Sequence, residues 1–146
     1  MANSSHALAH KIFILDAELQ KPLASENRRK IVENLVKDLL STLDMKELGP
    51  LSFYDATDLD FPGWSFVQPI TTSHITGHYF FEEKTGKADI HIDIYSCKEF
   101  EWEDVVPMLH KHLFLDTWIG NSLIRSIDPN SRNAIQISGN GATKLR

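Results

Sequence analysis

Cysteine, positive charge and long apolar segments are all scarce in this sequence of 146 residues. The single cysteine, Cys97, excludes an intrachain disulfide and a cysteine-based zinc site, and leaves a buried thiol or a chemically used one as the alternatives. Fifteen Lys and Arg against twenty Asp and Glu give a formal net charge of −5. Because this balance provides no general attraction to phosphate backbones or anionic lipid, neither nucleic acid nor a membrane is expected as a partner.

No apolar run approaches the ~18 residues that a membrane-spanning helix needs. The first residues, MANSSHALAHK, also lack the basic start and the apolar stretch of a signal peptide. We therefore expect a cytoplasmic protein. Repeats and low-complexity segments are missing as well, and hydrophobic residues make up 42% of the chain, as in ordinary globular proteins. A chain of this length and composition is expected to fold as one domain over residues 1–146.

Hydrophobic periodicity predicts two helices and a series of strands. In the first helix, within residues 25–45, apolar residues recur at helical spacing from Ile31 to Leu43, and Ser25 is available as the N-cap. The second helix lies within 102–113 and is expected to begin near Glu103, so that Pro107 falls in its first turn. The predicted strands cover 9–17, 51–56, 64–70, 74–82, 88–96 and 116–127, and residues 134–146 form a short strand or a tail.

The connections between the central strands are of hairpin length, which indicates an antiparallel or mixed sheet. One example is the segment EKTGK, which joins the strands 74–82 and 88–96. The order strand, helix, four strands, helix, strand then predicts an α+β fold. We expect a two-layer sandwich, in which two helices cover one face of a mostly antiparallel sheet.

Seven histidines raise the possibility of a metal site, but their spacing does not favour one. His74 and His78 share a strand face at about 13 Å, too far apart to bind one ion. His110 and His112 are two residues apart on a predicted helix and point about 200° away from each other. The sequence therefore predicts no metal site.

Two other motifs fail for similar reasons. GWSFV lacks the second glycine of a hydrolase nucleophile elbow and precedes a strand rather than a helix. GNG, at residues 139–141, lacks the strand-to-helix context of a phosphate-binding loop and indicates a turn.

The segment TSHITGHYFFE, taken with GWS upstream and DIYSC downstream, matches an ordered pattern. It resembles the prokaryotic S-adenosylmethionine decarboxylases, in which a Gly-x-Ser segment precedes Ser-His-(Ile/Leu)-(Ser/Thr)-x-His-x-aromatic-x-Glu and an Asp-hydrophobic-aromatic-(Thr/Ser)-Cys segment follows. The resemblance covers roughly residues 8 to 128, beyond which lies a polar C-terminal tail. The positions of this chain that match the pattern are Ser65, Ser73, His74, His78, Phe80, Glu82, Asp93 and Cys97.

The resemblance implies a pyruvoyl-dependent decarboxylase of S-adenosylmethionine or a related amino acid, which in the family serves polyamine synthesis. The chain would cut itself between Thr72 and Ser73, and Ser73 would become the pyruvoyl cofactor, an electrophilic carbonyl that no standard side chain supplies. His78 would be the base of the elimination step, and Ser65 would stabilise the processing intermediate by hydrogen bonding. Cys97 would protonate the product after CO₂ is lost.

Other implications concern the substrate and the quaternary structure. Glu82 would accept hydrogen bonds from the ribose hydroxyls of the substrate, with Phe80 nearby. The family usually forms dimers, so that a homodimer acting on a small molecule is expected. Strand alternation places His78 and Phe80 on one face and Ser73 on the other, which suggests that Ser73 lies in a turn or bulge.

Three positions differ from the family pattern and leave a second hypothesis open. Thr72 replaces a glutamate, the family's Trp-Pro-Glu is Phe-Phe-Glu, and Leu59 replaces an aromatic that stacks on adenine, with Phe61 as a possible substitute. The alternative is a relative that does not process itself and that acts as a small-molecule-binding or regulatory protein, for example by pairing with an active paralogue.

Overall fold

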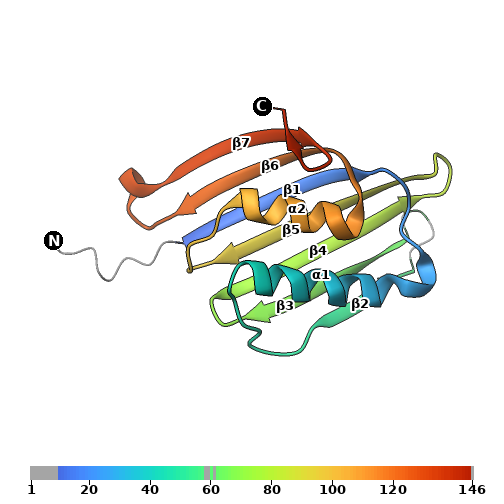
Figure 1. Ribbon diagram of the computed structural model, residues 1–146, viewed down its shortest axis with the longest axis horizontal. Helices are drawn as coiled ribbons and strands as arrows, with labels where there is room; N and C mark the ends of the chain where they lie inside the picture. Colours follow the sequence, from blue (N-terminus) through green and yellow to red (C-terminus); the bar gives the residue numbers. More distant parts are fainter. Residues whose placement is uncertain (1–9, 58–59, 61, 146) are drawn as a thin grey trace.

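The computed structural model describes residues 10–57, 60 and 62–145. They form one antiparallel sheet with both helices on the same face (Figure 1). The strands, in the order of the chain, are β1 (His10–Leu19), β2 (Ser52–Ala56), β3 (Gly63–Ile70), β4 (Ser73–Glu82), β5 (Lys87–Ser96), β6 (Leu115–Arg125), β7 (Asn133–Asn140) and β8 (Thr143–Lys144). The helices are α1 (Arg28–Thr42) and α2 (Trp102–Leu113), with short 3-10 turns at Ser25–Asn27 and Pro129–Ser131. The α+β class and the layering predicted from the sequence are confirmed.

The strand order in space is β2-β3-β4-β5-β1-β6-β7-β8, and every neighbouring pair is antiparallel. The middle of the chain forms consecutive hairpins, because the connections from β3 to β4 and from β4 to β5 are too short to cross over the sheet. β1 inserts between β5 and β6, so that the first strand of the chain lies in the interior of the sheet, whereas the last strand, β8, lies at an edge.

The core lies between the sheet and the two helices. Along β5 the residues Ile90, Ile92 and Ile94 are buried, and they alternate with more exposed residues, as the period-two pattern predicts. α1 contributes a stripe of buried residues that includes Val32, Leu35 and Leu39. The opposite face of the sheet, which we call the open face, is covered by neither helix.

Three details of the predicted elements need correction or completion. α1 begins at Arg28 with Asn27 as its N-cap residue, because Ser25 lies in the preceding 3-10 turn. α2 begins at Trp102, which makes Pro107 its sixth residue and places it beyond the first turn, on the exposed side of the helix. The segment 134–146, left open between strand and tail, contributes most of β7, which pairs with β6 along its full length, and the short strand β8.

No helix in the part of the chain that the structure describes is long and apolar enough to cross a membrane. The GNG segment at 139–141 ends β7 and begins the turn to β8, in which Gly141 has a φ of +59°. A glycine adopts this conformation without the steric cost that a side chain would add.

Candidate functional site

The bond between Thr72 and Ser73 lies at the end of the tight turn between β3 and β4. Thr71 and Thr72 form the turn, and Ser73, the first residue of β4, pairs with Ile70 on one side and Ser96 on the other. The φ of Ser73 is +156°, a backbone conformation that residues with a side chain rarely adopt. The expectation that Ser73 lies in a turn or bulge is therefore wrong: the turn ends at Thr72, and Ser73 is paired within the sheet, although its own backbone conformation is unusual.

Two contacts from the end of β5 hold Thr72. The backbone N–H of Cys97 donates a hydrogen bond to the carbonyl oxygen of Thr72 at 3.0 Å. The buried hydroxyl of Ser96 donates to Oγ1 of Thr72 at 2.8 Å and accepts from the backbone N–H of Lys98 at 2.9 Å. The carbonyl that would be attacked in self-cleavage thus has a fixed hydrogen-bond donor, and Cys97 lies beside the bond.

Ser65 and His78 form the second part of the predicted site. They are directly opposite each other on β3 and β4, and Oγ of Ser65 lies 2.7 Å from Nδ1 of His78. Alternation along β4 places His78 and Phe80 on the open face, since their neighbours Gly77 and Tyr79 are buried. Hydroxyl and imidazole therefore form a hydrogen-bonded pair that faces away from the helices.

Within one chain, the structure does not bring the Ser65–His78 pair close to the Thr72–Ser73 bond. His78 is five residues from Ser73 along an unbroken strand, which corresponds to about 17 Å. Glu82, at the far end of β4 opposite Lys87, is nine residues from Ser73, or about 30 Å. Phe61, the third residue predicted to contact substrate, lies outside the described residues, as does Leu59.

A histidine that the sequence did not single out lies directly across from His78. His91 on β5 contacts two carboxylates, with Nδ1 at 2.6 Å from Asp16 and Nε2 at 2.5 Å from Asp89. Burial alone would lower the pKa of His91, but the hydrogen bonds from its ring to the two carboxylates outweigh burial and raise its pKa above the usual range. The rings of Phe80 and His91 form a T-shaped contact, with their centroids 5.7 Å apart.

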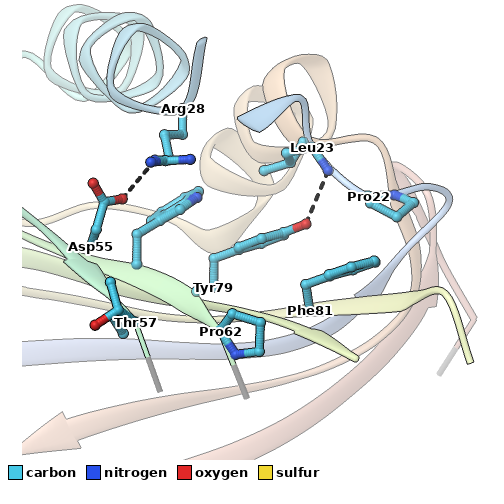
Figure 2. A pocket seen from close by; sticks show the side chains of 11 residues that line it. Pro22, Leu23, Arg28, Asp55, Thr57, Pro62, Tyr79 and Phe81 are labelled. Carbon is cyan, nitrogen blue, oxygen red and sulfur yellow. Dashed lines mark hydrogen bonds and ion pairs between the residues drawn. The ribbon is translucent and has the colours of Figure 1, made fainter. Parts of the chain in front are cut away.

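A cavity of about 460 Å³ lies on the opposite, helix-covered side of the sheet, where the start of α1 meets the edge strands (Figure 2). Its walls include Trp64 and Tyr79, whose rings stack at 5.0 Å, and Phe81. Nε of Arg28 pairs with Asp55 at 2.6 Å on one side of the cavity. The backbone N–H of Leu23 donates to the Tyr79 hydroxyl, and burial is the main reason that the pKa of this tyrosine is raised. Among the residues that the structure describes, none of those predicted for the site lines this cavity.

Within the described residues, no three side chains of His, Cys, Asp or Glu lie close enough together to hold a metal ion. The histidines of the predicted site contact other side chains. His78 bonds to Ser65, and the ring of His74 lies 5.5 Å from that of Tyr95.

Comparison with known proteins supports the resemblance to a known family. A search of curated proteins gave no match. Residues 20–126, well over half of the chain, match the family described as S-adenosylmethionine decarboxylase, and this range contains the whole segment from Ser65 to Cys97. The chain therefore belongs to the S-adenosylmethionine decarboxylase family.

Proposed function

We propose that the chain cuts itself between Thr72 and Ser73 and becomes a pyruvoyl-dependent decarboxylase of S-adenosylmethionine or a related amino acid, in polyamine synthesis. The observation that carries this proposal is the hydrogen bond from the Cys97 N–H to the Thr72 carbonyl oxygen. It polarises the one carbonyl that self-cleavage must attack, and the serine that would attack it is the next residue.

The first step converts the peptide bond to an ester. Oγ of Ser73 attacks the carbonyl carbon of Thr72 and loses its proton, while the Cys97 N–H stabilises the negative charge on the oxygen. The carbon–nitrogen bond then breaks and the nitrogen of residue 73 takes up a proton. The unusual φ of Ser73 favours this step, because the strain in that backbone can be released when the peptide bond opens.

The second step breaks the ester and requires a base. A base removes the proton from Cα of residue 73, and the Thr72 carboxylate leaves from Cβ. Addition of one water and release of ammonia convert the remaining dehydroalanine to the pyruvoyl group. His78 suits the role of base because an imidazole titrates near neutral pH and Ser65 orients the ring.

His78 of the same chain is about 17 Å from Ser73 along β4, so we propose that a second copy of the chain supplies it. The open face is suited to such contact, since it carries the exposed apolar side chains of Val67, Phe80 and Ile119. In a symmetric homodimer each Ser65–His78 pair would lie beside the Thr72–Ser73 bond of the other copy. Each dimer would then contain two complete sites.

The residues present fit a pyruvoyl group derived from Ser73, because Ser73 and its activated neighbour are already in place. When formed, the group supplies a carbonyl that condenses with the amine of an amino acid and accepts the electrons left by CO₂. The thiol of Cys97, the residue that follows β5 and whose N–H contacts Thr72, provides the proton that replaces CO₂. Glu82 and Phe80, from the second copy, bind the distal part of the substrate.

Mass spectrometry of the purified, denatured protein tests the proposal. We expect two fragments, residues 1–72 and 73–146, the second with a pyruvoyl terminus. The Ser73→Ala variant should give one chain, because it lacks the attacking hydroxyl. A wild-type protein that stays intact at 16.6 kDa would exclude self-processing.

The separation of Ser73 from His78 favours one alternative, a family member that does not process itself and that binds a small molecule or regulates an active paralogue. An intact chain that still binds S-adenosylmethionine in calorimetry would support this alternative. A cleaved chain that releases CO₂ from the same compound would exclude it.

A further inference from the structure

A second cavity, of about 270 Å³, lies on the open face where β1 begins and β6 ends. We call it the basic pocket. It is lined by His10, Tyr95, Arg125, Ser126, Ile127 and Arg132. His10 and Arg125 are directly opposite each other on β1 and β6, and Tyr95 comes from the neighbouring strand β5.

Contacts within the basic pocket fix the positions of its cationic side chains. The guanidinium of Arg125 lies over the ring of Tyr95 at 4.6 Å, a cation–π contact. Nη1 of Arg132 donates to the carbonyl oxygen of Ser126 at 3.0 Å. The Tyr95 hydroxyl and Nδ1 of His10 are 2.7 Å apart. Because these side chains are held before a ligand arrives, binding would cost little ordering entropy.

Both arginines of the basic pocket lack an acidic partner among the residues that the structure describes, although the chain has a net charge of −5. Arg28 and Arg29, in contrast, pair with Asp55 and Glu33.

The carboxylate nearest in sequence to Arg132 is Asp128, and its oxygens are already used. They accept hydrogen bonds from the backbone N–H of Asn130 and the hydroxyl of Ser131. Two guanidinium groups without a carboxylate therefore line the same small cavity.

We propose that the basic pocket binds the anionic group of a small molecule, a carboxylate or a phosphate. The planar fork of a guanidinium matches the oxygens of both groups, and two such forks favour an anion over a neutral ligand. The pocket also borders the reactive segment, because the Tyr95 ring that forms its wall lies 5.5 Å from the ring of His74, the residue after Ser73. The Tyr95 ring thus contacts both the basic pocket and His74.

Titration of the full-length protein with sodium phosphate and, separately, with sodium glutarate tests this site by NMR at low ionic strength. We expect saturable shifts for the amides of residues 125–132 with at least one of the two anions, and the tighter anion identifies the ligand chemistry. Arg125→Gln and Arg132→Gln should each weaken binding by about tenfold or more, because each removes a charge-assisted hydrogen bond. Arg125→Lys should restore part of the affinity, since it keeps the charge but not the fork.

Arg29→Gln is the matched control, because Arg29 is an exposed arginine on α1, on the other side of the sheet. It should bind both anions as the wild type does. Shifts that do not saturate, or an equal loss of affinity in Arg29→Gln and Arg125→Gln, would overturn the site. The titration does not depend on cleavage at Thr72, so that an uncut protein that binds anions would contradict the proposed function but not the basic pocket.

Discussion

The backbone N–H of Cys97 donates a hydrogen bond to the carbonyl oxygen of Thr72 at 3.0 Å. This contact joins the residue after β5 to the turn before β4. In the proposed function Cys97 has two separate roles: its main chain activates the bond to be cut, and its side chain is left for the later chemistry.

The first prediction follows from this division. Cys97→Ala keeps the backbone N–H, so we expect cleavage between Thr72 and Ser73 to proceed as in the wild type. Release of CO₂ from the substrate should fall at least about a hundredfold, within the range that general acid catalysis contributes. Mass spectrometry measures the cleavage, and trapping of labelled CO₂ measures the turnover. A Cys97→Ala protein that stays uncut would show that the thiol itself acts in processing.

The second prediction concerns the support of Thr72 by Ser96. Ser96 is fully buried and its hydroxyl makes two hydrogen bonds, to Thr72 and Lys98. Ser96→Ala leaves both partners without this contact, and we expect a loss of about 1–3 kcal/mol in the free energy of unfolding together with slower cleavage. Urea denaturation of the Ser73→Ala background gives the stability without interference from cutting. Ser41→Ala, at an exposed position of α1, should change neither quantity.

Much of the fold could be predicted from local patterns. The alternation of Ile90, Ile92 and Ile94 with polar residues predicted β5, and the apolar stripe from Ile31 to Leu43 predicted α1, because both depend only on residues close in sequence. The predicted start of α2, near Glu103, was one residue too late, because the helix begins at Trp102. The missing N–H of Pro107 restricts where this residue can lie in a helix but does not fix its position.

The arrangement of the site was harder to predict. The family pattern grouped Ser73 with His78 in one site. Both residues lie on the same extended strand, however, and the rise of about 3.3 Å per residue keeps them far apart. The same rise per residue also argues against a metal site formed by His74 and His78. The contact of His91 with Asp16 depends on the register of β5 against β1, two strands that are far apart in sequence. No local pattern encodes that register.

A third prediction tests the packing beneath β4. A Cβ at Gly77 would lie 2.4 Å from the ring of Phe66, which is fully buried, so that Gly77→Ala must displace a core side chain or the strand. We expect a loss of about 1–3 kcal/mol in the free energy of unfolding. Gly49→Ala is the control, because nothing lies within 4 Å of a Cβ there, and its effect should stay within about 0.5 kcal/mol. Equal stabilities of the two variants would contradict the packing of Phe66 on β4.

The fourth prediction uses the titration of His91. Its pKa is raised in the folded protein by Asp16 and Asp89, so the folded state binds the proton more tightly than the unfolded chain does. The stabilisation is therefore fully present below the unfolded value of about 6.5 and is lost as the pH rises through the folded pKa.

An NMR titration of the His91 ring should show a midpoint above 6.5, and the double variant Asp16→Asn and Asp89→Asn should lower it. In urea denaturation, the difference in stability between wild type and His91→Gln should shrink as the pH rises from about 5.5 to about 8.5. A difference that stays constant over this range would show that the two carboxylates do not hold a protonated ring.

The last prediction tests the division of the site between two copies. Ser73→Ala retains the Ser65–His78 pair but has no serine to cut, whereas His78→Ala retains Ser73 but has no base. Each variant alone should stay uncut. When the two are co-expressed, a mixed dimer joins Ser73 of one chain to His78 of the other, so that the His78→Ala chain should be cut and the Ser73→Ala chain should remain intact. The masses of the two variants differ, so one spectrum distinguishes them.

The same mixture with the double variant Ser73→Ala and His78→Ala in place of Ser73→Ala should give no cleavage, because neither chain then carries the base. If wild type is cut and the mixture is not, Ser73 and His78 must act within a single chain, and β4 would have to bend sharply between them.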